Sequence, residues 1–384
     1  MSYPSIDSLQ KALGSEFFDN RQDIKKAAGR AMGTVVELIT FYVLRQWGLL
    51  PHLTIERGLA EFANEAITHN VEFGIHPIHA SHRVSLPSRL PVSTSSILKA
   101  SKGGKGLPSE LTRHFNSDHH KATQLLSADQ VLRNACTVAE SEHNLLIANL
   151  VDYSGEGVIA DFALLAPSPF AMVECKRVGV EDGARKGPTT IEKAKQGAYV
   201  AKHVSALQKV RGRDGKLYGV MPLREGRFQI RELTEEIRRL VFDAPKEELD
   251  GFTLTVGVVS NHGNWFTRGD PNKELAVLQQ SYDWLLFLSD AGIVEFVQDT
   301  ILAPSPGLQP VKDAFEASYR SGVSGSNQCT KVKIALPAHR ALVEYFEKNI
   351  AKIESTWFSV LAPSVGELND LRSELAALAK RFGT

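Results

Sequence analysis

Residues 144–178 read NLLIANLVDYSGEGVIADFALLAPSPFAMVECKRV, and this stretch has the clearest strand pattern in the chain. It holds three apolar runs, at residues 144–152, 158–165 and 170–178, which are separated by short segments rich in Gly, Ser and Pro. Apolar runs of this length between turn residues are typical of β-strands. Three strands joined by short turns predict an antiparallel meander.

Three charged side chains on this predicted meander are candidates for a catalytic or metal site. Glu174 and Lys176 lie two residues apart, so the alternation of a strand directs both to one face and Cys175 to the other. Asp161 lies on the preceding predicted strand, and we expect the turn to bring it alongside them. Two carboxylates and an ammonium would then converge at one sheet edge, where hard cations such as Mg²⁺ find oxygen ligands.

The spacing Asp-(twelve residues)-Glu-x-Lys resembles the PD-(D/E)XK nuclease superfamily, to which many restriction endonucleases belong. The resemblance rests on IADFALL around Asp161 and on FAMVECKRV around Glu174 and Lys176, with Ala160 where the name-giving motif has proline. It implies that Asp161 and Glu174 hold Mg²⁺, with Mn²⁺ as a substitute, that the carbonyl of Cys175 joins them, and that Lys176 helps to activate water. The alternative is a cross-strand ion pair on a solvated sheet face.

Two predicted helices flank the meander. The helix at residues 20–48 is apolar on every side around Glu37 (TVVELITFYVL), which indicates burial. In the family, the helix before the sheet often carries an acid that reaches the metal site, so the resemblance implies this role for Glu37; the alternative is a buried carboxylate paired with an arginine. The helix at residues 190–210 carries Gln196, and the family often has Gln or Lys there near the site. The alternative for Gln196 is an ordinary place on the helix surface.

The whole pattern predicts an α/β protein with a restriction-endonuclease-like core, that is, a mixed central β-sheet flanked by helices. The core is expected at residues 20–300, with an additional helical N-terminal insertion at about 50–140 for DNA recognition, and a mainly helical C-terminal region at 301–384. The further expected elements are extended segments at 54–59 and 71–78, a flexible loop at 93–109, helices at 127–142 and 273–288, a central strand at 252–260 and C-terminal helices at 338–358 and 365–381.

Composition narrows the class of protein. The chain has 384 residues, with 44 Lys and Arg against 44 Asp and Glu, so a nuclease of this charge is expected to have a polarised surface with a basic groove at its site. Three cysteines in no metal-ligand spacing indicate a reduced, cytoplasmic protein. No uninterrupted apolar run long enough for a membrane span, no export signal and no phosphate-binding loop is present, so we expect neither a membrane nor a nucleotide cofactor as partner.

These observations predict a Mg²⁺-dependent type II restriction endonuclease that cuts double-stranded DNA to 5′-phosphate and 3′-hydroxyl ends, acting as a homodimer. Alternatives are a repair or recombination nuclease of the same superfamily and a catalytically silent DNA-binding protein. DNA contacts are expected from basic and polar side chains, although each of them could simply be solvated or form a turn. These are Lys99, Lys102, Lys105, Arg211, Arg213, Arg224, Arg227, Asn261 and His262.

Overall fold

The computed structural model describes residues 6–17, 24–58, 70–101, 107–154, 157–179, 199–262, 273–319 and 327–382. Its helices are α1 (Ile6–Phe17), α2 (Ile24–Gln46), α3 (Thr94–Ser101), α4 (Ser109–Thr112), α6 (Leu233–Phe242), α7 (Lys273–Ser281), α8 (Asp290–Val297), α9 (Gln309–Tyr319), α10 (Leu336–Thr356) and α11 (Leu368–Phe382). Its first strands are β1 (Leu53–Arg57), β2 (Val71–Ile75), β3 (Ile78–Leu86), β4 (Val92–Ser93), β5 (Gln124–Leu126), β6 (Val131–Arg133), β7 (Cys136–Glu140), β8 (Leu145–Ser154), β9 (Gly157–Leu165) and β10 (Ala171–Gly179). The remaining strands are β11 (Gln208–Arg211), β12 (Leu217–Pro222), β13 (Phe228–Glu232), β14 (Leu254–His262), β15 (Trp284–Leu288), β16 (Lys333–Ala335) and β17 (Phe358–Ala362).

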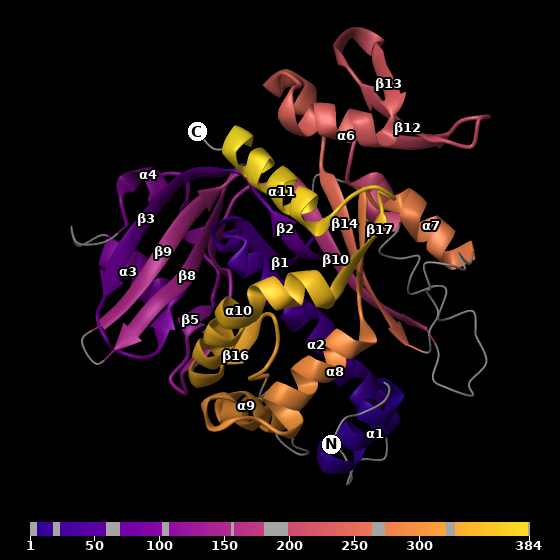
Figure 1. The fold of residues 1–384 in the computed structure, drawn as a ribbon. Coiled ribbons are helices and arrows are strands. Elements are labelled where there is room, and N and C mark those ends of the chain that lie inside the picture. The colour runs from indigo at the N-terminus through magenta and orange to yellow at the C-terminus, as the bar shows by residue number, and fades with distance from the viewer. Residues whose placement is uncertain are drawn as a thin grey trace.

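A mixed sheet of six strands, in the order β1-β2-β10-β14-β15-β17, forms the centre of the described structure (Figure 1). β10 pairs antiparallel with β2 and parallel with β14, and β14 pairs parallel with β15. Parallel neighbours need a long crossover connection, which the chain between β10 and β14 supplies. The predicted α/β class and the predicted central strand at residues 252–260 are therefore confirmed.

Helix α2 covers one face of this sheet. Phe41 of α2 stacks on Phe73 of β2, with 6.5 Å between the ring centroids, and both side chains are fully buried. Gly48, at φ 79°, follows the helix in the left-handed conformation that ends many helices. The stretch Ala27–Gln46 is long and apolar enough to cross a membrane by length and composition alone, but most of it is buried inside the protein. The helix predicted at residues 20–48 is confirmed where the chain is described.

The predicted three-stranded meander is wrong, although its three strands exist as β8, β9 and β10. β9 pairs with β8 and β3 in a separate sheet of order β3-β9-β8-β7, whereas β10 lies between β2 and β14 in the central sheet. The chain passes between the two sheets twice, from β2 to β3 and from β9 to β10. Backbone bonds join the two crossings, from Ala166 N to Pro77 O (3.0 Å) and from Phe170 N to Ile75 O (2.9 Å). The strands from β3 to β9 are thus an insertion between two neighbours of the central sheet.

Several other local expectations are also overturned. The helix predicted at residues 127–142 is replaced by β6 and β7, the end of the helix predicted at 190–210 by β11, and the second half of the helix predicted at 273–288 by β15. The loop predicted at 93–109 contains α3, and α4 begins at its last residue. Short apolar runs fit a buried helix and a buried strand equally well, so partners elsewhere in the chain decide between them.

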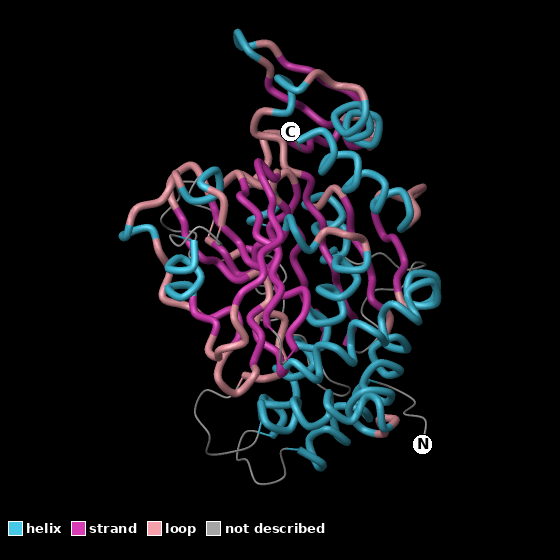
Figure 2. Tube along the Cα trace, turned by 90° about the vertical axis from the view of Figure 1, so that its left-hand side faces the viewer, coloured by secondary structure: helices cyan, strands magenta, loops and turns pink. Residues whose placement is uncertain are grey.

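The C-terminal region does not stand apart from the core. The two predicted helices are confirmed as α10 and α11, but β17 lies between them and pairs with β15 at the edge of the central sheet. Figure 2 shows most of the helices on one side of the strands and below them. The small sheet β11-β12-β13 and α6 project from the top of the molecule in Figure 1.

Gly257 on β14, the strand beside β10, lies against the ring of Tyr282. An added Cβ would meet the buried ring of Tyr282 at 2.7 Å, so Gly257→Ala is expected to lower the free energy of unfolding by about 1–3 kcal/mol in chemical denaturation. Gly33→Ala in α2 is the control, because nothing lies within 4 Å of its added Cβ, and it should stabilise by up to about 1 kcal/mol. Equal stability of Gly257→Ala and Gly33→Ala would contradict the close packing of Tyr282 against Gly257.

Candidate active site

Strands β2 and β10 diverge at the point where their acidic residues face each other. Their ladder runs from Ala171↔Ile75 to Val173↔Phe73 and then ends. Beyond Val173, carboxylates accept the N–H groups in place of backbone carbonyls. The N–H of Cys175 donates to Glu72 Oε2 at 2.6 Å, and the N–H of Glu72 donates to Glu174 Oε2 at 3.2 Å. Both glutamates are buried, and each is fixed by the opposite strand.

Two lysines complete the constellation. Lys176 Nζ lies 2.8 Å from Glu174 Oε1 and 4.0 Å from Glu72 Oε1. Lys331, in the segment that leads into β16, lies 3.7 Å from the same Glu72 oxygen, 3.0 Å from Glu37 Oε2 and 3.3 Å from Glu56 Oε1. We call these residues the carboxylate cluster: Glu37, Glu56, Glu72, Glu174, Lys176 and Lys331. It joins α2, β1, β2, β10 and the C-terminal region.

The cluster has four glutamates and two lysines, an excess of acidic groups, and the pKa values of both Glu72 and Lys331 are raised. Burial, and then the charge of Glu174, raise the pKa of Glu72 to about 8, although Lys331 and Lys176 act in the opposite direction. Burial opposes the charged form of Lys331, but Glu72, Glu37 and Glu56 outweigh it and raise the pKa of its ammonium. A site with this balance favours an added cation.

Asp161 does not belong to this cluster, and the prediction that it lies alongside Glu174 and Lys176 is wrong. On β9 it accepts a two-pronged pairing from Arg83 of β3, with 2.7 Å from Nε to Oδ1 and 2.8 Å from Nη2 to Oδ2, and both side chains are partly exposed. Glu72 occupies the place that was expected for Asp161, because β2 and not β9 is the neighbour of β10.

Sequence reasoning missed Glu56, Glu72 and Lys331. A signal for Glu72 exists in the sequence VEFGI of β2, where a carboxylate interrupts an otherwise apolar strand that is buried throughout. Such a group needs a partner. Lys331 has no local signal, because the residues that it contacts lie far away in the chain.

The other predicted site residues have mixed outcomes. Glu37 is in the cluster, where it pairs with Lys331 and not with an arginine, and its role at a metal stays a prediction. Cys175 belongs to the core under α2, on the face opposite Glu174, as alternation predicted. All three cysteines are buried and free. Gln196 lies outside the described residues.

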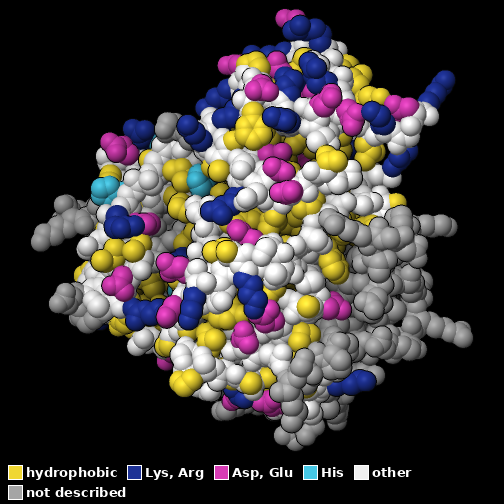
Figure 3. All heavy atoms as spheres, in the orientation of Figure 1, with side chains coloured by type: hydrophobic (Ala, Val, Ile, Leu, Met, Phe, Trp, Pro, Cys, Tyr) yellow, Lys and Arg dark blue, Asp and Glu magenta, His cyan; other side chains and the backbone are white. Residues whose placement is uncertain are grey.

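The predicted DNA contacts fall in two regions. Lys99 lies on α3, at the insertion. Arg211, Arg213, Arg224 and Arg227 all lie on the projecting sheet β11-β12-β13 or in its turns. Figure 3 shows Lys and Arg side chains gathered over this projection, with acidic side chains among them.

The remaining predicted contacts are not placed. Lys102 and Lys105 lie outside the described residues. The same holds for the side chains of Asn261 and His262, whose backbones end β14.

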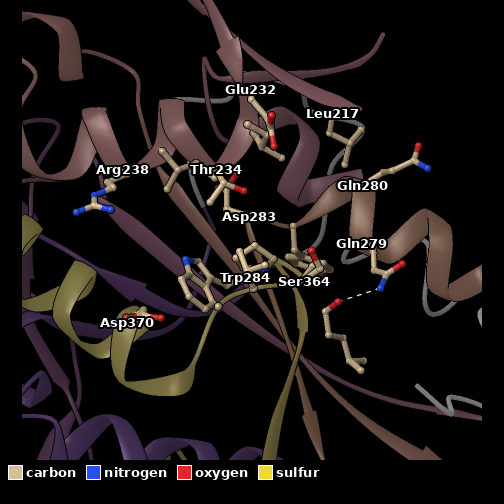
Figure 4. A pocket seen from close by; sticks show the side chains of 18 of the residues that line it. Leu217, Glu232, Thr234, Arg238, Gln279, Gln280, Asp283, Trp284, Ser364 and Asp370 are labelled. Atoms are coloured by element: carbon tan, nitrogen blue, oxygen red, sulfur yellow. Dashed lines mark hydrogen bonds between the residues drawn. The ribbon is translucent and has the colours of Figure 1, made fainter. Parts of the chain in front are cut away.

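A cavity of about 660 Å³ lies between the projecting sheet, α7 and the chain that links β17 to α11. Figure 4 shows Trp284, Asp283, Arg238 and Glu232 around it, and Gln279, whose Nε2 donates to the carbonyl of Leu361 at 2.9 Å. Acidic and basic side chains both line it, and none of the lining residues belongs to the carboxylate cluster. The cavity is therefore distinct from the cluster.

The carboxylates of Glu72 and Glu174 could supply some, but not all, of the ligands of a Mg²⁺ ion. Within the described ranges, no group of three or more His, Cys, Asp or Glu side chains is arranged to hold a metal. Mg²⁺, however, is commonly bound through one or two carboxylates, with waters and substrate phosphates completing its shell. The Oε2 atoms of Glu72 and Glu174 accept backbone N–H groups, so the Oε1 atoms, which lie on the side of Lys176, are the oxygens that would face such an ion.

No protein-family model, no curated protein and no solved structure matches this chain. Its function must therefore be inferred from the cluster itself and from the motif around Glu174 and Lys176.

The shifted pKa of Glu72 has a consequence for stability. A carboxyl that titrates near 8 when folded and near 4.5 when unfolded holds its proton more firmly in the native state, so stability is lost as the pH rises between these values. Glu72→Gln cannot ionise and is expected to gain roughly 1–3 kcal/mol over the wild type at about pH 9 and little at about pH 5 in urea denaturation.

Glu235→Gln, on the exposed face of α6, is the control and should stay within about 0.5 kcal/mol of the wild type. A stability difference between Glu72→Gln and the wild type that does not depend on pH would rule out a raised pKa for the buried Glu72.

Proposed function

We propose that the protein is a Mg²⁺-dependent DNA endonuclease with a restriction-endonuclease-like core, of the type II restriction class. One observation carries the proposal: Glu72, Glu174 and Lys176 converge where β2 and β10 diverge. Two fixed carboxylates beside an ammonium provide what metal-assisted phosphodiester hydrolysis requires of a protein.

The order of elements supports the resemblance to the PD-(D/E)XK superfamily. The motif implies an acid on one strand, Glu-x-Lys on the next strand in the sheet, and an acid on the helix before the sheet. With Glu72 in place of Asp161, the elements α2, β1, β2 and β10 carry this pattern in chain order. Glu72 in place of Asp161 therefore supports the interpretation of the motif, with a different strand supplying the acid.

In this proposal, the acidic residues of the cluster bind the metal and Lys176 acts on the water or the phosphate. Glu72 and Glu174 would hold Mg²⁺, with the carbonyl of Cys175 as a further ligand implied by the resemblance. The ion, when bound, polarises the phosphate and lowers the pKa of a water molecule. Lys176, whose own pKa is raised by Glu174 and Glu72 against the effect of burial, stays protonated and can orient that water or stabilise charge on the phosphoryl oxygens.

The substrate would be held by basic side chains outside the cluster. Phosphate contacts need no net positive charge if the basic groups are gathered locally. The arginines of the projecting sheet β11-β12-β13 and Lys99 on α3 are the described candidates for such contacts. A homodimer on a two-fold symmetric DNA site remains the proposed assembly.

A catalytically silent DNA-binding protein is the second candidate, and Lys331 is the observation that favours it. Its ammonium lies 3.7 Å from Glu72 Oε1, near the place that a metal would take. A lysine that fills a former metal site would leave the fold intact and remove the reaction.

Substitution of the two buried acids separates these functions. Glu174→Gln and Glu72→Gln are expected to lower Mg²⁺-dependent cleavage of supercoiled plasmid at least about a hundredfold while DNA binding in gel-shift assays persists. Asp161→Asn is the matched control and should cleave within a few-fold of the wild type, because Asp161 pairs with Arg83 and lies on a strand that does not pair with β10.

Wild-type rates in Glu174→Gln would refute the assignment. DNA binding without cleavage by the wild-type protein, with Mg²⁺ or with Mn²⁺, would favour the silent protein. Discrete fragments from a sequenced phage DNA would identify a site-specific enzyme, whereas degradation of linear DNA alone would identify a repair-type nuclease.

A further inference from the structure

Lys331 is the most deeply buried cation of the carboxylate cluster. Its side chain is 3% exposed, against 20% for Lys176, and its Nζ lies 5.8 Å from the centre of the Phe73 ring. An ammonium is removed from water only at a high cost unless anions compensate for it. Three carboxylates from three separate elements supply that compensation here: Glu37 of α2, Glu56 of β1 and Glu72 of β2.

The backbone around Lys331 holds its side chain in this place. Its carbonyl accepts a hydrogen bond from Asn134 Nδ2 at 2.9 Å, and the N–H of Asn134 donates to the carbonyl of Val332 at 2.9 Å. Thr330 closes the turn, because its hydroxyl accepts from the N–H of Lys333 at 3.0 Å. Backbone hydrogen bonds therefore fix the main chain at Lys331, from which its side chain reaches the cluster.

Lys331 also faces the oxygen that a metal would need. Oε2 of Glu72 accepts the N–H of Cys175, which leaves Oε1 for a metal. That Oε1 atom lies 3.7 Å from Lys331 and 4.0 Å from Lys176. A divalent ion bound at about 2.1 Å from it would lie only a few ångströms from the Lys331 ammonium. Like charges at such a distance repel strongly in a buried site.

We propose that Lys331 is the resident cation of the carboxylate cluster: it holds Glu37, Glu56 and Glu72 together in the metal-free protein and weakens the binding of a divalent cation at Glu72 and Glu174. The inference rests on the proposed function, because it takes Glu72 and Glu174 as the metal ligands. Lys331 is a positioning residue in this scheme and touches neither the scissile phosphate nor the attacking water. Tight metal binding would then require the added negative charge of a DNA phosphate.

The test compares Lys331→Met and Lys331→Gln with the wild type in two measurements on metal-free protein. Thermal unfolding should show a lower Tm for both variants, because three carboxylates lose their counter-charge. Titration with Mn²⁺, followed calorimetrically and by the electron paramagnetic resonance of the free ion, should show binding about tenfold tighter or more than in the wild type. Lys333→Met is the matched control: it removes a lysine two residues away that has no ion pair among the described residues, and it should leave the Mn²⁺ affinity unchanged.

A purely structural role for Lys331 predicts a different result. The variants would then lose stability, and folded variants, verified by circular dichroism, would bind Mn²⁺ equally well or more weakly than the wild type; this outcome overturns the proposal. If neither variant folds without metal, millimolar Mn²⁺ is expected to restore folding, and a failure to do so also overturns it.

Glu174→Gln separates this proposal from the proposed function. Loss of Mn²⁺ binding in Glu174→Gln, with unchanged affinity in Lys331→Met, would leave the nuclease site standing and refute only the role of Lys331. Absence of Mn²⁺ binding in the wild type and in both Lys331 variants would refute the metal site and, with it, this inference. Binding that appears only after Lys331 is replaced would support the resident cation directly.

Discussion

The exchange of hydrogen bonds between β2 and β10 is the interaction on which the candidate site depends. A backbone ladder would normally satisfy these N–H groups, but beyond Val173 the carboxylates of Glu72 and Glu174 accept them instead. This arrangement buries two acids side by side, which is costly unless cations or protons compensate. Lys176, Lys331 and the raised pKa of Glu72 are the compensation that the structure shows.

The rest of the fold positions this pair. Helix α2 covers the sheet beneath it and supplies Glu37, and the C-terminal region supplies both Lys331 and the edge strand β17. Segments from both ends of the chain thus meet at one cluster. Because the charged residues of the cluster come from five separate parts of the chain, only one short motif, Glu174-Cys175-Lys176, can be recognised in the local sequence. This convergence also means that the cluster forms only when the tertiary structure is complete.

Local patterns gave the strands that became β8, β9, β10 and β14, the buried helix α2, and the shared face of Glu174 and Lys176. Each of these follows from the period of hydrophobic residues or from strand alternation, which are properties of neighbouring residues. The errors share one cause. The helix expected at residues 127–142, the meander of β8, β9 and β10, and the role of Asp161 all required a choice of partner that no local pattern specifies.

By itself, the sequence determined that a Glu-x-Lys strand would present an acid and an ammonium together, and that Glu37 would lie in a buried helix. The place of Glu72 as the second acid, and of Lys331 beside it, depends on tertiary contacts. The reason is the double passage of the chain between two sheets, which removes β9 from the side of β10 and places β2 there. Strand pairing is a contact between distant residues, so it is settled by the packing of the whole chain.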